Sequence, residues 1–362
     1  MKKDEPTARL KHETNVSRWR VTMRGSKTLL VTGGAGFVGG HLVDALLARG
    51  YRVVCLDLFT YAGSLEHLAS AMVTYPHRRV DRLWQPEWLR DRETRLIIAR
   101  GDINDTALIS SILASCDGVL ALAAETHVDY SYHATGPFIR ANVNGVHSLL
   151  EALRLAGPKK RLLHVSTDEV YGEMLSGHTA ESAPMRPRNV YSATKACGDL
   201  LVRTYGEVFG LDVITVRPCN LFGPRQQPKD LIPKTFSHLL AGQKMTVHGT
   251  GRHVREYLYV RDAAEFIIDV FERGRRGEAY NLSSQIFRNT LQVVRAVAAV
   301  LGLRAKDVIT FVEDRPNADR RYSGDNRKIR RLLGKRWQLT PFDDVIALMH
   351  ADFAARKPAP LL

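Results

Sequence analysis

A glycine-rich segment near the N-terminus constrains the fold of this chain more than any other feature. The apolar run 28–31 predicts a buried strand, and the residues after position 40 have the apolar spacing of a helix. The segment 32–40 between them reads Thr-Gly-Gly-Ala-Gly-Phe-Val-Gly-Gly. Glycines at 33, 36 and 39 permit a tight turn, a close approach of a pyrophosphate to backbone N–H groups, and close packing of helix on strand.

The second strand indicates which dinucleotide such a turn would bind. Residues 51–56 form an apolar run that ends at Asp57. An acidic side chain about twenty residues beyond the glycines hydrogen-bonds the ribose diol of adenosine and repels a 2′-phosphate. A plain strand–helix–strand turn without a cofactor is the alternative. The order of strand, glycines, helix, strand and acid favours a cofactor site, and NAD over NADP.

Strands and helices continue to alternate, which is typical of a parallel sheet covered by helices. We therefore predict an α/β fold built on a Rossmann-type doubly wound parallel sheet, with an NAD-binding domain over residues 27–218. A loop rich in proline and glycine follows. Residues 219–362 are expected to form mainly a smaller C-terminal substrate-binding lobe, with some segments returning to the first domain.

Two segments stand apart from this pattern. Residues 1–26 have no apolar periodicity and many basic residues, and are expected to form a flexible basic tail. Residues 76–95 read as an insertion in which Trp84 and Trp88 could anchor a short helix. The insertion is either a surface excursion held by these tryptophans or a lid or partner contact.

Composition limits the class of protein. With 44% hydrophobic and 25% charged residues over 362 positions, the chain is an ordinary globular one, and no apolar run approaches a membrane span. The N-terminus has no apolar stretch of a secretory signal, and four well-separated cysteines suit free thiols in a reducing cytoplasm. A net charge of +14 suits an anionic ligand such as a nucleotide diphosphate. No nucleic-acid motif and no metal-ligand set is recognised.

The candidate catalytic groups follow a later strand. The apolar run 161–165 leads into Ser166, Thr167, Asp168 and Glu169. Polar groups at the C-terminal end of a parallel strand face the crevice in which open α/β sheets bind ligands. An acidic pair at a helix N-terminus would be the simpler interpretation of these carboxylates.

Tyr191 and Lys195 lie further along the chain at positions i and i+4, which share one face of a helix. Seen alone, they could be an incidental helix pair. Combined with the upstream glycines and the acidic pair, they predict one pocket that holds a base, an acid, a tyrosine and a lysine.

Several stretches carry a family resemblance. The chain resembles dTDP-glucose 4,6-dehydratases, within the extended short-chain dehydrogenase/reductase superfamily, over about residues 27–340. The resemblance is carried by the glycine motif with Tyr191-x-x-x-Lys195 and by residues 57–66, 123–129, 166–172, 254–260 and 314–322. Sugar 4-epimerases of this superfamily lack both carboxylates of the Asp168–Glu169 pair, and UDP-glucuronate decarboxylases have Ser-Glu there.

The resemblance implies a reaction and a role for each catalytic group. Tyr191, assisted by Lys195, takes the proton of the C4 hydroxyl while NAD accepts the hydride. Glu169 removes the C5 proton, protonated Asp168 protonates the departing C6 hydroxyl, and the hydride returns to C6 to give a 4-keto-6-deoxyhexose. Thr167 hydrogen-bonds the sugar.

Binding residues are expected on the same grounds. The expected NAD contacts are Gly33, Gly36, Phe37, Val38, Gly39, Asp57, Thr60, Ser64, Asp102, Ile103, Ala123, Ala124, Thr126, Asn142, Ser166, Tyr191 and Lys195. The expected nucleotide-sugar contacts are Thr126, His127, Thr167, Asn220, Arg255, Asn281 and Arg320. The resemblance also implies a homodimer, without nucleic-acid or membrane partners.

The chain departs from the family pattern on the substrate side. The departures are the insertion, Tyr130-Ser131-Tyr132-His133, Arg225 and His253. They leave the nucleotide base and the sugar open, so a related dehydratase or epimerase acting on a UDP-sugar or another nucleotide sugar is the alternative enzyme. A catalytically silent NAD-binding scaffold is the alternative of another class, although a scaffold has no need of all four catalytic side chains.

Overall fold

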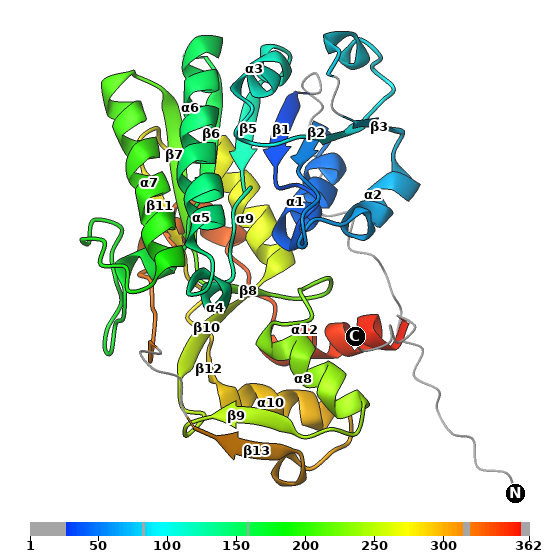
Figure 1. Ribbon diagram of the computed structural model, residues 1–362, viewed down its shortest axis with the longest axis vertical. Coiled ribbons are helices and arrows are strands. Elements are labelled where there is room, and N and C mark those ends of the chain that lie inside the picture. The colour runs from blue at the N-terminus through cyan, green and yellow to red at the C-terminus, as the bar shows by residue number, and fades with distance from the viewer. Residues whose placement is uncertain (1–26, 82–83, 158, 314–318, 356–362) are drawn as a thin grey trace, which may run out of the picture.

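A large parallel sheet forms the centre of the molecule (Figure 1). The computed structural model describes residues 27–81, 84–157, 159–313 and 319–355, so the basic tail predicted at 1–26 lies outside the described residues. Eight strands have the order β11-β7-β6-β5-β1-β2-β4-β3, and every pairing between them is parallel. The prediction of a doubly wound Rossmann-type sheet is confirmed.

The strands of this sheet are β1 Thr28–Thr32, β2 Arg52–Asp57, β3 His77–Asp81, β4 Leu96–Arg100, β5 Gly118–Ala121, β6 Arg161–Val165, β7 Asp212–Pro218 and β11 Ala279–Leu282. The helices packed around it are α1 Phe37–Ala48, α2 Ala69–Thr74, α3 Thr106–Ala114, α4 Val128–Ser131, α5 Thr135–Ile139, α6 Gly145–Ala156, α7 Val190–Val208, α9 Val260–Arg273 and α11 Arg327–Leu333. A π-helical turn, Arg140–Asn144, joins α5 to α6.

Alternating strand residues pack against opposite layers of helices. In β1, Leu29 and Val31 join the core made with α1 and α9, whereas Leu30 joins the core made with α3, α6 and α7. Both faces of the sheet are therefore buried, which explains why its strands are apolar runs instead of alternating apolar and polar residues.

The insertion at 76–95 adds an edge strand. β3 pairs with β4 in parallel, and a short 3-10 helix, Pro86–Leu89, follows and contains Trp88. Trp84 and Trp88 meet edge to face at 5.8 Å, and the Arg52 guanidinium donates to the Leu89 and Asp91 carbonyls at 2.9 and 2.6 Å. No described residue of the insertion lines the main cavity, so the structure favours the surface excursion over the lid.

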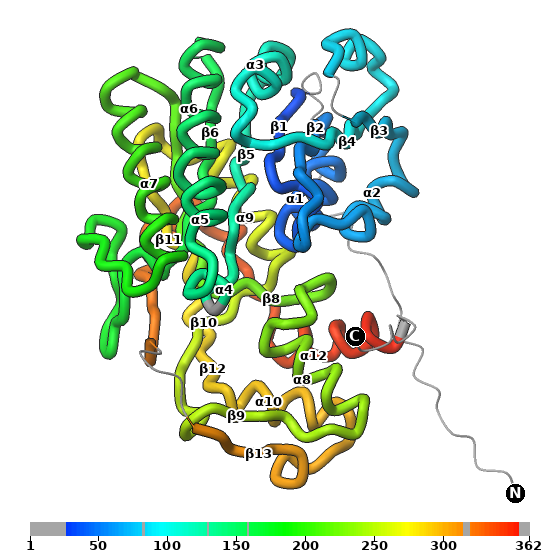
Figure 2. Tube along the Cα trace, in the orientation of Figure 1, coloured from blue at the N-terminus to red at the C-terminus, as the bar shows by residue number. Residues whose placement is uncertain are grey.

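The smaller lobe has its own core and two small sheets. Its strands are β8 Asn220–Phe222, β10 Val254–Tyr259 and β12 Phe287–Asn289 in one sheet, and β9 Met245–His248 and β13 Ile309–Val312 in the other. Its helices are α8 Leu231–Leu240, α10 Thr290–Val300 and α12 Phe342–Ala355. Figure 2 shows the chain passing between the lobes: after β8 to β10, the segment α9–β11 returns to the large sheet before β12 re-enters the small lobe.

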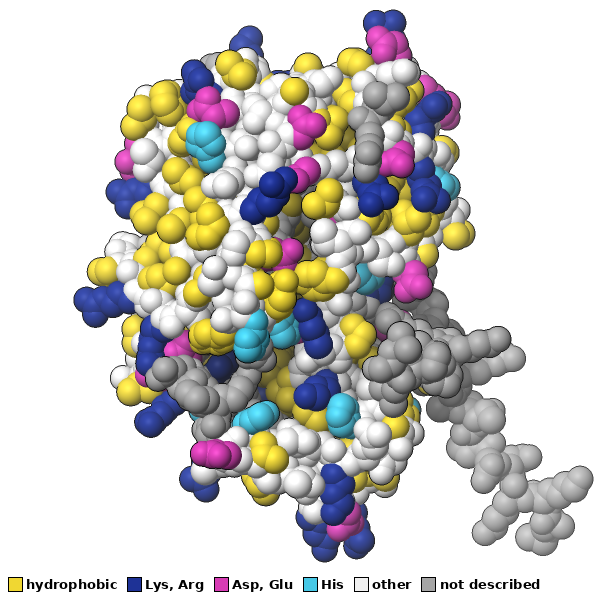
Figure 3. Space-filling model, viewed as in Figure 1, with side chains coloured by type: hydrophobic (Ala, Val, Ile, Leu, Met, Phe, Trp, Pro, Cys, Tyr) yellow, Lys and Arg dark blue, Asp and Glu magenta, His cyan; other side chains and the backbone are white. Residues whose placement is uncertain are grey.

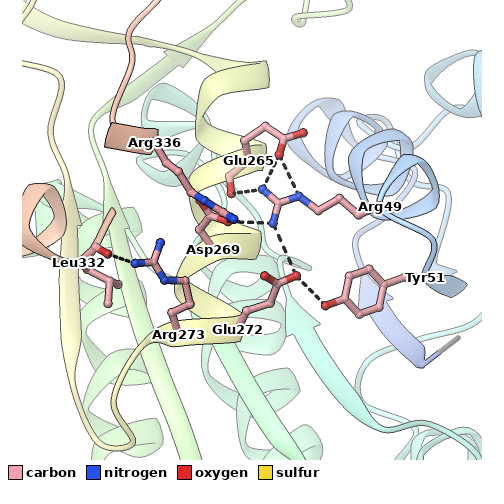
Figure 4. A network of polar contacts seen from close by, with 8 residues as sticks. All are labelled: Arg49, Tyr51, Glu265, Asp269, Glu272, Arg273, Leu332 and Arg336. Atoms are coloured by element: carbon pink, nitrogen blue, oxygen red, sulfur yellow. Dashed lines mark hydrogen bonds and ion pairs between the residues drawn. The ribbon is translucent and has the colours of Figure 1, made fainter. Parts of the chain in front are cut away.

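An ionic network ties the returning segment to the first helix (Figure 4). The Arg49 guanidinium follows α1 and contacts the α9 carboxylates of Glu265 and Asp269, the latter at 2.8 Å. Arg336 also pairs with Asp269, at 2.7 Å. The network fixes three parts of the chain that are far apart in sequence.

Within the described residues, no helix combines the length and the apolar character that a membrane span requires.

Candidate active site

A cavity of about 990 Å³ lies between the two lobes. Its upper wall consists of the segments that follow β1, β2, β4, β5 and β6, and its lower wall consists of residues from β8 to β10. Figure 3 shows this face hollowed between the lobes, with His and Lys/Arg side chains gathered around the hollow. The C-terminal ends of parallel strands therefore meet at the cavity, as the doubly wound topology requires.

The glycine turn has the geometry of a dinucleotide site. Gly33 adopts a φ of +69°, and a Cβ there would lie 2.7 Å from the Ala123 backbone nitrogen. A Cβ on Gly39 would lie 2.1 Å from the Gly33 carbonyl oxygen, so α1 can approach the turn only without a side chain. α1 begins with no capping side chain, which leaves its first backbone N–H groups to donate to an anion.

The Asp57 carboxylate is held in place at the end of β2. Its oxygens accept from the Ala35 and Phe59 backbone N–H groups at 3.0 and 2.9 Å, and the residue lines the cavity. Burial raises the pKa of this carboxyl, opposed by the two hydrogen bonds. The turn, the free helix N-terminus and the fixed acid fit NAD. Ser64 does not line the cavity, because its hydroxyl accepts from the Glu66 N–H at the start of a 3-10 turn.

The tip of β5 forms the next part of the wall, where Ala123, Ala124, Thr126 and His127 line the cavity. Asn142 supports this tip from behind instead of lining it. Its amide exchanges two hydrogen bonds of 2.9 Å with the Glu125 backbone and donates to the Thr194 hydroxyl at 3.0 Å. We expected the Asn142 side chain to contact the cofactor, and the structure instead places it behind the wall, where it supports the tip of β5.

Five of the six candidate groups around β6 and α7 line the cavity, namely Ser166, Thr167, Glu169, Tyr191 and Lys195. The Lys195 ammonium donates to the Val165 carbonyl at 2.7 Å, and burial lowers its pKa to about 8. Burial, and then the nearby Glu169 carboxylate, raise the pKa of the Tyr191 phenol.

Asp168 is buried behind this wall and does not line the cavity. Burial raises the pKa of its carboxyl well above the usual range, and Glu256 and then Glu169 raise it further. Glu169 faces the cavity and accepts from the Asn189 amide at 3.4 Å; burial raises its pKa too. The structure thus separates the two carboxyls into an inner and an outer one.

At the substrate end of the cavity, Asn220 and Arg255 line the wall as expected, whereas Asn281 and Arg320 do not. Asn281 is fully buried, accepts from the Tyr171 hydroxyl at 2.8 Å and donates to the Thr179 carbonyl at 2.9 Å. Because this amide is fully buried and does not line the cavity, the structure places it behind the wall instead of against a sugar, which corrects that prediction. Arg320 is exposed, and its backbone N–H donates to the Glu173 carboxylate at 2.6 Å.

The cavity wall also contains residues for which we predicted no role. They include Arg140, which pairs with Asp102 at 2.7 Å, and Gln226, Gln227, Lys229, Asp230, Lys234, His248 and Tyr257. Four of them lie between β8 and α8, where the sequence offers only a composition rich in proline, glycine and polar residues. No cluster of potential metal ligands occurs in the described part of the chain.

Comparison with known proteins identifies the family. The model of the NAD dependent epimerase/dehydratase family matches residues 29–283. The chain belongs to this family. The matched residues include the large sheet and the first part of the small lobe, which provide most of the cavity wall.

Curated relatives of this chain include a dTDP-glucose 4,6-dehydratase and a glycan biosynthesis protein. The chain is 41% identical over 341 residues to a dTDP-glucose 4,6-dehydratase of Xanthomonas campestris pv. campestris (strain B100), covering 89% of this chain and 91% of the relative. It is 41% identical over 305 residues to the low-salt glycan biosynthesis protein Agl12 of Haloferax volcanii, covering 84% and 92%.

A solved structure agrees. DesIV, a dTDP-glucose 4,6-dehydratase from Streptomyces venezuelae with NAD and TYD bound, matches with a TM-score of 0.81 and 37% identity, covering 90% of this chain and 97% of that chain. The resemblance to dTDP-glucose 4,6-dehydratases is confirmed by these relatives.

Proposed function

We propose that this protein is an NAD-dependent 4,6-dehydratase that converts dTDP-glucose into its 4-keto-6-deoxy derivative. The observation that carries the proposal is the Asp168–Glu169 pair at the end of β6, beside Tyr191 and Lys195. A 4-epimerase needs only the tyrosine and lysine, whereas elimination of water also needs a base at C5 and an acid at C6. The relatives that carry this name support the same assignment.

The cavity would hold NAD along the glycine turn. Gly33, Gly36 and Gly39 leave room for the pyrophosphate, and Asp57 would accept from the adenosine ribose. The other wall residues expected to contact it are Phe37, Val38, Thr60, Asp102, Ile103, Ala123, Ala124, Thr126 and Ser166. When bound, NAD supplies the hydride acceptor for C4 and the hydride donor for C6.

The side chains divide the proton transfers. Tyr191 takes the proton of the C4 hydroxyl as a phenolate, which the Lys195 cation on the same helix face favours. Glu169, on the cavity side, removes the C5 proton that the new ketone acidifies. Asp168, whose pKa is raised by burial and by neighbouring carboxylates, would remain protonated behind the wall. It would donate to the departing C6 hydroxyl once the wall in front of it shifts on substrate binding. Thr167 hydrogen-bonds the sugar.

Substrate binding would draw on both lobes. Thr126 and His127 come from the large lobe, and Asn220 and Arg255 come from the small one. Arg255 is suited to the diphosphate because a planar guanidinium matches two phosphate oxygens. Closure of the lobes around one ligand would bring the anomeric diphosphate to the small lobe and C4 to Tyr191.

We also propose a homodimer in the cytoplasm. Ile139, Leu155 and Leu200 are large apolar side chains exposed on α5, α6 and α7, which stand together on the outer side of the sheet (Figure 1). Exposed apolar side chains on adjacent helices suit a protein interface. The free cysteines, three of them buried, suit a reducing compartment.

A substrate panel tests the function. The purified protein is incubated with dTDP-glucose, UDP-glucose, UDP-GlcNAc and GDP-mannose without added NAD, and products are followed by NMR. We expect a 4-keto-6-deoxy sugar from dTDP-glucose and no change in the others. Turnover of UDP-glucose in place of dTDP-glucose would show that the enzyme prefers uracil as the nucleotide base. Bound NAD without turnover of any of the four sugars would contradict the proposal that the protein is a dehydratase.

A further inference from the structure

The segment between β8 and α8 leaves the small lobe, contacts the large lobe and returns to the small lobe. We call residues 223–230 the interlobe strap. Four of its side chains, Gln226, Gln227, Lys229 and Asp230, line the main cavity. In Figure 1 this segment lies below α1, the helix that follows the glycine turn. The strap therefore borders the part of the cavity assigned to NAD.

One end of the strap is fastened by Arg225. Its guanidinium donates to the Asp44 carboxylate at 2.8 Å, to the His41 Nδ1 at 2.6 Å and to the His67 carbonyl. Asp44 and His41 belong to α1, and His67 follows the loop after β2. The Arg225 backbone has a φ of +68°, which side-chain-bearing residues rarely adopt. Such a conformation persists when surrounding contacts over-determine it.

His41 completes the fastening as a neutral imidazole. Because a guanidinium can only donate, Nδ1 accepts from Arg225 and Nε2–H donates to the Pro224 carbonyl at 2.9 Å. Burial, and then the Arg225 charge, lower the pKa of His41 to about 3. The ring thus accepts from the strap side chain and donates to the strap backbone at any physiological pH.

The other end of the strap meets two loops of the cofactor half. The Gln227 amide donates to the Ala62 carbonyl at 3.3 Å, and the Lys229 ammonium lies 4.3 Å from the centre of the Tyr61 ring. The Tyr61 hydroxyl in turn donates to Glu125 at 2.9 Å. The strap, the loop after β2 and the loop after β5 are therefore joined across the cavity.

We propose that Arg225 is a positioning residue that locks the strap over the cofactor half of the cavity and so sets the rate at which NAD leaves. The inference rests on the proposed function. Because the proposed reaction returns its hydride to the same sugar, turnover requires no exchange of cofactor. A locked strap is therefore compatible with catalysis, whereas it would obstruct a dehydrogenase that exchanges NAD in every cycle.

The first test compares NAD release from the wild type and from Arg225→Gly. Glycine accepts the positive φ, so the substitution removes the guanidinium without forcing the backbone to move. Full-length proteins are purified with the NAD they carry, and release is followed by trapping free NAD with an excess of alcohol dehydrogenase and ethanol. We expect release to be at least about tenfold faster in the variant, since charge-assisted contacts are lost.

The second test asks whether Arg225 acts through α1. Asp44→Asn removes the carboxylate charge and keeps the shape, and should speed release by less than Arg225→Gly does. In the double variant, release should exceed that of Arg225→Gly by less than about twofold, because residues that act through one contact are not additive. Arg304→Ala, which breaks an exposed Arg–Asp pair of 2.7 Å elsewhere in the small lobe, is the matched control and should release NAD at the wild-type rate.

The outcomes separate the inference from the function. A wild type that holds NAD and an Arg225→Gly variant that releases it at the same rate would overturn the role of Arg225 alone. Fully additive effects of the Arg225 and Asp44 changes would also overturn it. A wild type that binds no NAD would overturn the proposed function and the inference with it. A purely structural role of Arg225 would lower the urea midpoint without changing the release rate of the folded protein.

Discussion

Tyr191 and Lys195 are both buried at the cavity wall, and burial disfavours the charged form of each. It lowers the pKa of the lysine ammonium to about 8 and raises the pKa of the tyrosine phenol. Catalysis at C4 requires phenolate and ammonium together. Oxidised nicotinamide would add positive charge beside this pair and so favour the phenolate.

The pH dependence of the rate should report Lys195. A lysine with a pKa of about 8 loses its positive charge as the pH rises through that value, so kcat should fall on the alkaline side from about pH 8. Lys195→Arg keeps the cation at all of these pH values and should remove this limb, even with lower activity. A limb at the same pH in Lys195→Arg, measured as product formed per second from pH 6 to 10, would assign it to another group.

The two carboxyls at 168 and 169 should be separable by substitution. Glu169→Gln retains Tyr191 and Lys195, so it should still oxidise C4 and reduce bound NAD in a single turnover. Elimination should slow by about 10²–10⁴-fold because the C5 base is missing. Absorbance at 340 nm follows the first step and NMR follows the product. Product formation at the wild-type rate would contradict the role of Glu169.

At the scale of elements, the turn between β1 and α1 is determined by close approach. Gly33 combines a positive φ with a neighbouring backbone nitrogen at 2.7 Å from its ideal Cβ position. Gly50, at the far end of α1, has a φ of +90° but nothing within 4 Å of that position. Comparing Gly33 with Gly50 therefore separates two contributions to the free energy of unfolding: the strain of the backbone conformation and the steric contact of the added Cβ.

Alanine at these two positions should therefore act differently. Gly50→Ala should destabilise the protein by about 1 kcal/mol, from backbone conformation alone. Gly33→Ala should cost about 2 kcal/mol or more, because the turn must also move away from the tip of β5, and should lower the NAD content of the purified protein. Urea unfolding and released NAD measure the two effects. Equal effects of both substitutions would contradict this account.

At the scale of the molecule, the first helix and the returning segment are held by buried charges. The side chains of Arg49 and Asp269 are only 8% and 3% exposed. Arg49 also contacts Glu265 and Glu272, the last at 3.5 Å, and the Tyr51 hydroxyl donates to Glu272 at 2.7 Å (Figure 4). Removing one partner of a buried ion pair leaves the other desolvated and uncompensated.

Arg49→Ala should lower the free energy of unfolding by about 3 kcal/mol for this reason. Arg304→Ala, which breaks a pair with side chains 76% and 48% exposed, should change it by less than about 0.5 kcal/mol. Urea denaturation of both variants against the wild type measures the difference. Similar values for the two would show that burial of the network contributes little.

The proposed dimer can be tested on the outer helices. Leu155 and Leu200 are 68% and 49% exposed on α6 and α7. Glutamate at both positions should convert the dimer into a monomer, because burying these charges at an interface costs more than the association provides. Leu303→Glu, at an exposed position of the small lobe, is the control. Light scattering after size-exclusion chromatography reads the mass, and an unchanged dimer would exclude this interface.

The fold class and the glycine turn could be predicted from the amino-acid sequence, which also indicates Asp57 and the proposed catalytic segments at 166–169 and 191–195. Each of these depends on residues close together in the chain, whose periodicity or spacing is visible locally. The alternation of strands and helices also limits which strands can be neighbours, since parallel strands joined by helices pack in a restricted topology.

Only the tertiary structure decided which side chains reach the cavity. Asn142, Ser64 and Asn281 have the right chemistry for ligands, but the fold places all three outside the cavity wall. The side chain of each one contacts backbone or side-chain groups of the protein there. Arg225 shows the converse, because its partners Asp44 and His41 lie more than 180 positions away in sequence. Local patterns contain no information about such partners, which come together only when both lobes have formed around the sheet.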